Sequence, residues 1–93
     1  MRLVYTNEAV EDLTRLRDFI AKHNPDAAAR IAAELIKRIE QLLKTPNIGH
    51  PVDRAPQATS IRDMVFGNYI VRYSTHAETL IVLRAWHRLE NRA

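Results

Sequence analysis

Residues 61–87 read IRDMVFGNYIVRYSTHAETLIVLRAWH, and this stretch decides the fold. Three runs rich in β-branched and aromatic residues, 61–66, 69–75 and 79–87, are separated first by two residues and then by three. Connections this short are typical of antiparallel hairpins, and the first of them contains a glycine that suits a tight turn. The stretch therefore predicts three consecutive antiparallel strands.

A helix is predicted between a short first strand and this stretch. Residues 2–5, RLVY, suit a strand, and Thr6 or Asn7 can cap a helix that runs to about Lys22. Acidic residues in its first turns, Asp12 among them, favour the positive end of the helix dipole. Apolar residues recur at spacings of three and four, which predicts one buried stripe. They are Val10, Leu13, Leu16, Phe19 and Ile20.

A second, longer helix is predicted after the sequence HNPDAAAR. Asn24 suits its capping position, and Pro25 suits its first helical position because the N–H that proline lacks is unpaired there anyway. Pro46 and Gly49 end it. Its apolar side consists of Ala28, Ile31, Ala32, Leu35, Ile36, Ile39, Leu42 and Leu43.

The predicted order of elements is β-α-α-β-β-β, with an irregular loop over residues 50–60. Two amphipathic helices must bury their stripes, and a sheet with one apolar face is the available partner. We therefore predict a single α+β domain over residues 1–93, in which a helical hairpin packs on one face of a small, largely antiparallel sheet. The other face stays open, and we expect function there.

Composition limits the class of protein. The chain has 93 residues, of which 46% are hydrophobic and 27% are charged, as in soluble globular proteins. It contains no apolar run long enough for a membrane span, and its N-terminus turns acidic before a signal peptide could form. It has no cysteine, which rules out disulfides and thiolate zinc sites. We expect a cytoplasmic protein.

The charge is unevenly composed along the chain. Residues 1–50 hold eight Lys/Arg against seven Asp/Glu, and residues 51–93 hold six arginines and no lysine against four Asp/Glu. Arginine favours planar, bidentate contacts with phosphate or carboxylate. The excess of positive charge is small, so either nucleic acid or an acidic protein remains a possible partner.

Strict alternation of side chains assigns a face to each residue of the last strand. Leu80 and Val82 then share a face with Arg84, Trp86 and Arg88, whereas Ile81, Leu83, Ala85 and His87 share the other. The same argument allows Arg62, Arg72 and Arg84 to meet on one surface, provided that the registers match. A shift of one residue would invert each assignment.

His87 suggests general acid–base chemistry at a phosphodiester, and the competing interpretation is a half-buried histidine bonded to a backbone carbonyl. No histidines or carboxylates occur at metal-ligand spacing, so we expect neither a metal nor a cofactor. The sequence also lacks a glycine-rich phosphate loop and a Gly-x-Ser-x-Gly elbow. A self-contained hydrolase is not expected.

Five stretches resemble the RelE/ParE superfamily of toxins from bacterial type II toxin–antitoxin modules. They are NEAVEDLTRLRDFI, NPDAAARIAAELIKRIEQL, TPNIGHPV, IRDMVFGNYIVRY and IVLRAWHR. Together they span nearly the whole chain in order. The turn with Pro46, Gly49 and Pro51, and the ending with Arg84, His87 and Arg88, carry most of the specificity.

The resemblance implies two alternative activities, because RelE-like members cleave mRNA on the ribosome and ParE-like members poison DNA gyrase. The ribonucleases resemble this chain at Tyr69 and Tyr73, but they place a basic residue where this chain has Ile70. They also carry lysines in the segment before that hairpin, and residues 45–68 contain none. The chain is therefore closer to the ParE branch, which implies a non-enzymatic toxin.

The resemblance also implies roles for particular residues. For a gyrase inhibitor, the target-binding residues are Arg84, Trp86, His87 and Arg88, with the segment up to Ala93 as a mobile extension. For a ribonuclease, the catalytic residues are His87, Arg62, Arg84 and Arg88. A third alternative is an inactive remnant that binds only its antitoxin.

A cognate antitoxin of the ParD or RelB kind is the implied partner, in a toxin–antitoxin hetero-oligomer. Its C-terminal segment folds onto the toxin, along the helical hairpin and at a sheet edge. The predicted antitoxin-binding residues are Leu16, Phe19, Ile20, Ile36 and Leu43.

Overall fold

The computed structural model describes residues 1–52 and 61–90, and it has the predicted α+β architecture. Its elements are β1 (Arg2–Tyr5), α1 (Asn7–His23), α2 (Ala28–Gln41), β2 (His50–Pro51), β3 (Ile61–Phe66), β4 (Tyr69–His76) and β5 (Thr79–His87). The two-residue strand β2 lies in the segment predicted as an irregular loop, so that prediction was wrong at its start. None of the described helices is long and apolar enough to cross a membrane.

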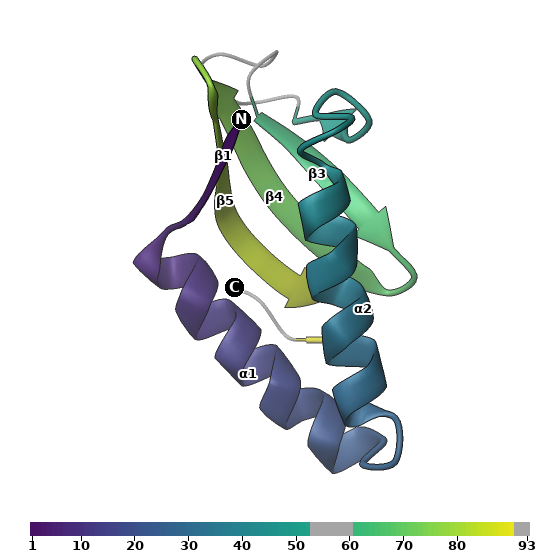
Figure 1. Cartoon of the computed structure of the whole chain (residues 1–93). Helices are drawn as coiled ribbons and strands as arrows, with labels where there is room; N and C mark the ends of the chain where they lie inside the picture. The colour runs from purple at the N-terminus through teal and green to yellow at the C-terminus, as the bar shows by residue number, and fades with distance from the viewer. Residues whose placement is uncertain (53–60, 91–93) are drawn as a thin grey trace.

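The sheet is mixed, with the strand order β1-β5-β4-β3-β2. β1 runs parallel to β5, and every other neighbouring pair is antiparallel. Both helices lie on the same side of the sheet and diverge from their connecting turn (Figure 1). The predicted helical hairpin on one face of a largely antiparallel sheet is therefore confirmed.

The helix boundaries follow from local hydrogen bonds. The Thr6 side chain accepts a hydrogen bond from the N–H of Ala9 at 3.0 Å, as expected for the cap of α1. The second helix begins at Ala28, later than predicted. The reason is that Asn24 still closes α1, because its N–H donates to the carbonyl of Ile20 at 2.7 Å. Residues 25–27 form a turn instead of the first turn of α2.

The core lies between the helices and the sheet. Its fully buried side chains include Leu16 and Ile39 from the helices and Val71, Tyr73 and Leu80 from the sheet. Burial of each large aliphatic side chain contributes about 1.5–3 kcal/mol. The buried stripe of α1 consists of Ala9, Asp12, Leu16 and Ile20. The predicted stripe was therefore rotated, and its first member, Val10, is 52% exposed.

A β-bulge changes the faces of β5. Tyr73 pairs with Val82 and Arg72 pairs with Arg84, so Leu83 is an extra residue on β5. Leu80 and Val82 face the helices before the bulge, and Ala85 and His87 face them after it. The strict alternation predicted from the sequence was wrong here. Arg84 and Trp86 do not share a face with Leu80 and Val82.

Candidate functional site

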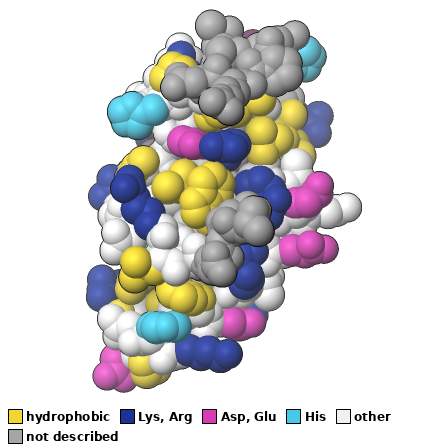
Figure 2. Space-filling model, turned by 180° about the vertical axis from the view of Figure 1, so that it is seen from behind, with side chains coloured by type: hydrophobic (Ala, Val, Ile, Leu, Met, Phe, Trp, Pro, Cys, Tyr) yellow, Lys and Arg dark blue, Asp and Glu magenta, His cyan; other side chains and the backbone are white. Residues whose placement is uncertain are grey.

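Three rows of side chains cross the face of the sheet that points away from the helices, which we call the open face. Directly opposed residues of neighbouring strands share a face. The rows are Val65–Ile70–Trp86, Asp63–Arg72–Arg84 and Ile61–Ser74–Ile81. The middle row is charged, and the outer rows are largely apolar. Figure 2 shows this side of the molecule, where apolar side chains lie next to basic and acidic ones.

Asp12 of α1 extends the middle row beyond β5. We call Asp63, Arg72, Arg84 and Asp12 the charged row. Arg72 donates to both carboxylate oxygens of Asp63 at 2.9 and 3.0 Å, and Arg84 donates to both oxygens of Asp12 at 2.7 and 3.1 Å. These hydrogen bonds raise the pKa of each arginine. The row has two guanidiniums in its middle and a carboxylate at each end.

Asp12 is the buried end of this row. Its side chain is 2% exposed, and it also accepts hydrogen bonds from Arg15 at 2.6 Å and from the backbone N–H of Ala85 at 2.9 Å. Burial alone would raise the pKa of Asp12, but the hydrogen bonds from Arg84, Arg15 and Ala85 outweigh it and lower the pKa to about 2. Asp12 is therefore ionised at neutral pH.

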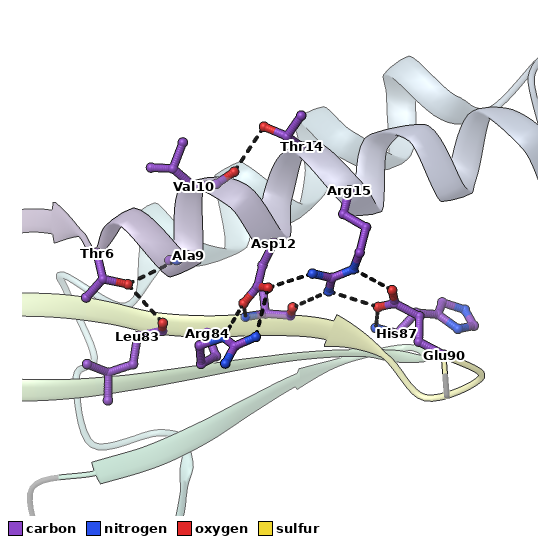
Figure 3. Close-up of polar contacts among 11 residues, drawn as sticks. Thr6, Ala9, Val10, Asp12, Thr14, Arg15, Leu83, Arg84, His87 and Glu90 are labelled. Atoms are coloured by element: carbon purple, nitrogen blue, oxygen red, sulfur yellow. Dashed lines mark hydrogen bonds and ion pairs between the residues drawn. The ribbon is translucent and has the colours of Figure 1, made fainter. Parts of the chain in front are cut away.

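Arg15 connects Asp12 to the turn that follows β5 (Figure 3). Its Nε donates to Glu90 at 2.6 Å, and its Nη2 donates to the other oxygen of Glu90 at 3.2 Å. Hydrogen bonding to Glu90, and then to Asp12, raises the pKa of Arg15. Glu90 also accepts the backbone N–H of His87 at 2.9 Å. The end of β5 is thus held to α1 by ion pairs.

Side chains of α1 and of its N-cap also complete the edge of β5 beyond the end of β1. Thr6 Oγ1 donates to the carbonyl of Leu83 at 2.9 Å, and Arg15 Nη2 donates to the carbonyl of Ala85 at 3.1 Å. Asp12 accepts the N–H of Ala85, as described above. Two polar side chains of α1 and that of its N-cap Thr6 therefore replace a neighbouring strand at this edge.

Sequence reasoning did not identify Asp12, Arg15 or Glu90 as site residues. For Asp12 a signal was present. It lies three residues after Ala9 and four before Leu16, so it shares their buried helix face. A carboxylate on a buried face requires cationic or N–H partners. The arginines predicted for the last strand are such partners.

His87 lies inside the molecule and is 7% exposed. Its Nδ1 accepts the backbone N–H of Leu89 at 3.0 Å, which puts the proton of the neutral ring on Nε2. The rings of Phe19 and Tyr69 lie with their centres 5.0 and 4.8 Å from that of His87. His87 is therefore more buried than either interpretation predicted, and its backbone partner is an N–H rather than a carbonyl.

The other predicted site residues, catalytic or target-binding, lie in different surroundings. Arg62 shares a face with Tyr73 and donates to the carbonyl of Gly49 at 2.8 Å, so the expected meeting of Arg62 with Arg72 and Arg84 was wrong. The Trp86 ring lies 5.2 Å from the guanidinium of Arg72. Arg88 is exposed beside the β3–β4 hairpin. Of the predicted extension up to Ala93, residues 91–93 lie outside the described residues, whereas Glu90 is bonded to Arg15 and to the N–H of His87.

An apolar groove of about 420 Å³ lies between α1 and α2. Three of the five predicted antitoxin-binding residues, Leu16, Ile20 and Ile36, line it. The other two do not: Phe19 stacks on His23, and Leu43 packs against the core. The remaining lining residues are Tyr5, Val10, Leu13, Thr14, Arg17, Ala32 and Leu35.

Among the described residues, no group of three or more His, Asp or Glu could hold a metal ion.

Comparison with known proteins identifies the family. The sequence model described as "ParE toxin of type II toxin-antitoxin system, parDE" matches residues 3–92. The chain belongs to the ParE toxin family. This match confirms the resemblance to RelE/ParE toxins and makes the protein a toxin of a type II toxin–antitoxin system.

Curated relatives carry RelE names. Toxin RelE1 of Caulobacter vibrioides is 33% identical over 86 residues, which cover 90% of this chain and 89% of the relative. Toxin RelE2 of the same organism is 31% identical over 86 residues, which cover 92% and 93%. The family model of this chain is thus named after ParE and these relatives are named after RelE, and the names leave its target open.

Solved structures share the fold of this ParE-family chain. The chromosomal ParDE toxin–antitoxin system from P. aeruginosa matches with a TM-score of 0.77 at 18% identity, covering 94% of this chain and 95% of that one. A conserved hypothetical protein from Helicobacter pylori matches with a TM-score of 0.60 at 16% identity, covering 97% of both chains. At these identities the likeness concerns the fold alone.

Proposed function

We propose that this ParE-family toxin acts by binding DNA gyrase and stabilising a cleaved-DNA state, without cutting RNA itself. One observation carries the proposal: the residues that a ribonuclease would need, His87, Arg62 and Arg84, do not converge. Catalysis of phosphodiester cleavage requires a proton carrier and charge-stabilising groups around one reacting phosphate. Binding to a target requires no such convergence.

The separation follows from the strand register. Arg62 is opposite Tyr73, and His87 is opposite Tyr69, which lies four residues earlier on β4. Four residues of strand correspond to roughly 13 Å. Arg84 lies on the open face, whereas Arg62 and His87 are on the face that carries Tyr73 and Tyr69. A single phosphate cannot contact all three side chains.

His87 is also poorly exposed for a general base, because only 7% of it is accessible, at the wall of a pocket that Phe19 and Tyr69 also line. A general base must lie within hydrogen-bond reach of the proton that it abstracts. The Nδ1 of His87 is occupied by the N–H of Leu89, and the ring is enclosed by Phe19 and Tyr69. We therefore assign His87 a supporting role behind the target-binding surface, instead of the direct contact predicted from the sequence.

Tyr73 is similarly committed to the fold. It is fully buried, and its hydroxyl donates to the carbonyl of Pro46 at 2.6 Å while accepting the N–H of Gly49 at 3.0 Å. Burial raises the pKa of this phenol. The ring therefore fixes the Pro46–Gly49 turn and is inaccessible to an RNA base. One of the two tyrosines that resemble those of RelE-like ribonucleases therefore has a structural explanation.

The experiment is a supercoiling assay with purified, folded toxin and DNA gyrase, scored for trapped DNA cleavage. We expect inhibition by the wild type and at least tenfold weaker inhibition by Arg84→Gln. Trp and Arg are the residue types most often found as binding hot spots, which supports Arg84, Trp86 and Arg88 as contacts. Unimpaired supercoiling in the presence of folded wild-type protein would contradict the proposal.

Ribosome-dependent mRNA cleavage is the second candidate, favoured by the RelE names of the relatives. The same protein preparation is tested on translating ribosomes, with the mRNA mapped for new ends. New mRNA ends that form with the wild type and not with His87→Ala would contradict the gyrase proposal and show RelE-like cleavage. A protein that is folded but inactive in both assays, and that does not arrest growth, would be the inactive remnant.

We propose that the groove between α1 and α2 receives an amphipathic segment of the antitoxin. Val10 is 52% exposed and Ile36 is 37% exposed, and both line the groove. Arg17 is the charged residue of its lining, so an acidic residue of the antitoxin is expected beside it. Among the described strands, β1 has a neighbour on one side only, so its outer edge, next to the groove residue Tyr5, can accept an added strand.

Introducing a negative charge into the groove tests this proposal. We expect Val10→Asp and Ile36→Asp to abolish co-purification with the co-expressed antitoxin, because each introduces a carboxylate into an apolar contact. The matched control is Val65→Asp, at a residue that is 43% exposed on the other side of the sheet. Equal loss of antitoxin by all three variants would contradict the groove as the site.

A further inference from the structure

We propose that Arg72 and Arg84 together form a carboxylate-binding site, and that the open face around them docks an acidic segment of the toxin's protein target. The inference rests on the proposed function, since it names the chemistry by which the target is held. It adds Arg72 and Ile70 to the site. It also commits to a protein ligand instead of nucleic acid.

The two arginines are an unusual pair within a sheet. Arg72 and Arg84 are directly opposite each other on β4 and β5, and like charges in this arrangement repel. Their side chains are 36% and 42% exposed. The flanking carboxylates of Asp63 and Asp12 hold the two guanidiniums in place by bidentate bonds. The fold thus maintains two adjacent cations at the centre of this face.

Both guanidiniums retain binding capacity. Each uses its Nε and Nη2 for its own aspartate. Within the described part of the chain, neither Nη1 group donates to an acceptor. Each Nη1 carries two N–H donors, and two neighbouring guanidiniums can hold both oxygens of one carboxylate. Because both side chains are partly exposed, these donors can serve an anion that approaches from solvent.

The charge of the row favours a carboxylate over a nucleic-acid backbone. Two arginines and two aspartates sum to zero, whereas binding to nucleic acid relies on net positive charge that displaces counterions. A run of phosphates would pass directly over Asp63, which is 23% exposed. A single carboxylate fits between the central guanidiniums without approaching either end of the row.

The surroundings of the site indicate a protein ligand. The row Val65–Ile70–Trp86 lies on one side of it, and the row Ile61–Ser74–Ile81 lies on the other. Interfaces between proteins combine an apolar centre with aromatic residues and arginine. Val65 is 43% exposed, and Arg72 stacks on Trp86 at 5.2 Å. We therefore expect the carboxylate to come from a segment whose neighbouring side chains are apolar.

The first test measures growth arrest after induced expression, because this readout does not depend on the identity of the target. We expect Arg72→Gln and Ile70→Ser to increase surviving colonies at least tenfold over wild type. Arg38→Gln is the matched control, since Arg38 is an exposed arginine paired with Glu34 on α2. Thermal unfolding of each purified variant shows that it is folded. Variants that are folded and as toxic as wild type would overturn the inference.

The second test uses the single tryptophan of the chain, Trp86, which lies on the proposed surface. Toxin labelled with 5-fluorotryptophan gives one ¹⁹F resonance. We expect addition of intact gyrase to shift or broaden it and Arg72→Gln to weaken the Kd at least tenfold. The Kd of Arg72→Lys is expected to lie between those of wild type and Arg72→Gln, because lysine keeps the charge but loses the planar fork. Gyrase binding that leaves the resonance unchanged would overturn the inference.

The remaining outcomes separate this inference from the proposed function. Growth arrest without gyrase inhibition would contradict gyrase as the target, and the Arg72 and Ile70 variants would still decide the surface. If the wild type binds a single-stranded RNA and Arg72→Gln does not, the ligand of this surface is nucleic acid and the proposed protein ligand is wrong. If the wild type self-associates and Ile70→Ser does not, the occupant of the open face is a second copy of this chain and the proposed target segment is wrong. A wild type that does not arrest growth would overturn both proposals.

Discussion

The two carboxylates that end the charged row lie in different surroundings. Asp12 is 2% exposed and accepts four hydrogen bonds from two arginines and one backbone N–H, whereas Asp63 is 23% exposed and pairs with Arg72. Asp12 joins two layers of the fold, and Asp63 joins two neighbouring strands. Ion pairs of similar geometry therefore have different energetic roles, because burial determines the cost of losing one partner.

The largest expected effect is that of Asp12→Asn. The amide keeps one acceptor oxygen but directs an NH₂ group at donors of Arg15, Arg84 or Ala85, so buried donors lose their acceptor. We expect a loss of about 3 kcal/mol in the free energy of unfolding. Urea denaturation followed by circular dichroism measures it. A loss below about 1 kcal/mol would show that Asp12 resembles a surface partner.

The next effect is a pH dependence that belongs to Asp12. The folded state lowers its pKa from the ordinary 3.8 to about 2. The resulting stabilisation is fully present above about pH 4, decreases as the pH falls, and is lost below the folded-state pKa; it amounts to about 2 kcal/mol. The measurement compares unfolding free energies of wild type and Asp12→Asn between pH 5 and pH 2. A difference that stays constant over this range would contradict the assignment.

At the other end of the row, Gly49 packs against the backbone of Asp63, and this packing is expected to contribute more to stability than the charge of Asp63. A Cβ at Gly49 would lie 2.7 Å from the Tyr73 hydroxyl and 2.9 Å from the carbonyl oxygen of Asp63. Gly49→Ala should therefore cost roughly 1–3 kcal/mol through overpacking. The control is Gly67→Ala, where φ is 57° and no heavy atom lies within 4 Å of the added Cβ. It should cost about 1 kcal/mol through backbone strain alone. Equal melting temperatures of the two variants would refute the steric argument.

The smallest effect is expected for Asp63→Asn, the counterpart of Asp12→Asn. Asp63 and Arg72 are both partly exposed, so water compensates for the lost ion pair, and we expect a change of less than about 1 kcal/mol. The same denaturation assay measures it. If Asp63→Asn destabilised the protein as much as Asp12→Asn, burial would not be the property that distinguishes the two ends.

Much of the fold could be predicted from the sequence, because the signals concerned are local. The three strands and their short connections are encoded within residues 61–87, and the cap at Thr6 is encoded within a few residues. The bulge at Leu83 could not be predicted in this way, since the apolar and polar residues of β5 are compatible with strict alternation. The extra residue depends on pairing with β4, which is a tertiary property.

The site was harder to predict for the same reason. Arg84 and Trp86 stood out as residue types, but their common row with Arg72 depends on strand register. Asp12 had an ordinary local explanation as an acid near a helix N-terminus, and this hid its place on the buried face. Its partners Arg84 and Ala85 lie more than 70 residues away along the chain. Contacts at such separation leave little trace in a local pattern.

The arrangement of β1, α1 and β5 has a consequence for how the toxin is synthesised. β1 pairs with β5, and Thr6 and Asp12 bond to residues 72 to 77 positions later. During translation, β1 and α1 therefore cannot form these contacts until β5 has left the ribosome. Arg84, which belongs to that strand, is fixed only at this final step. A nascent toxin is thus unable to present its complete binding surface until β5 has been made, and contacts that form this late are expected to govern the rate of unfolding more than that of folding.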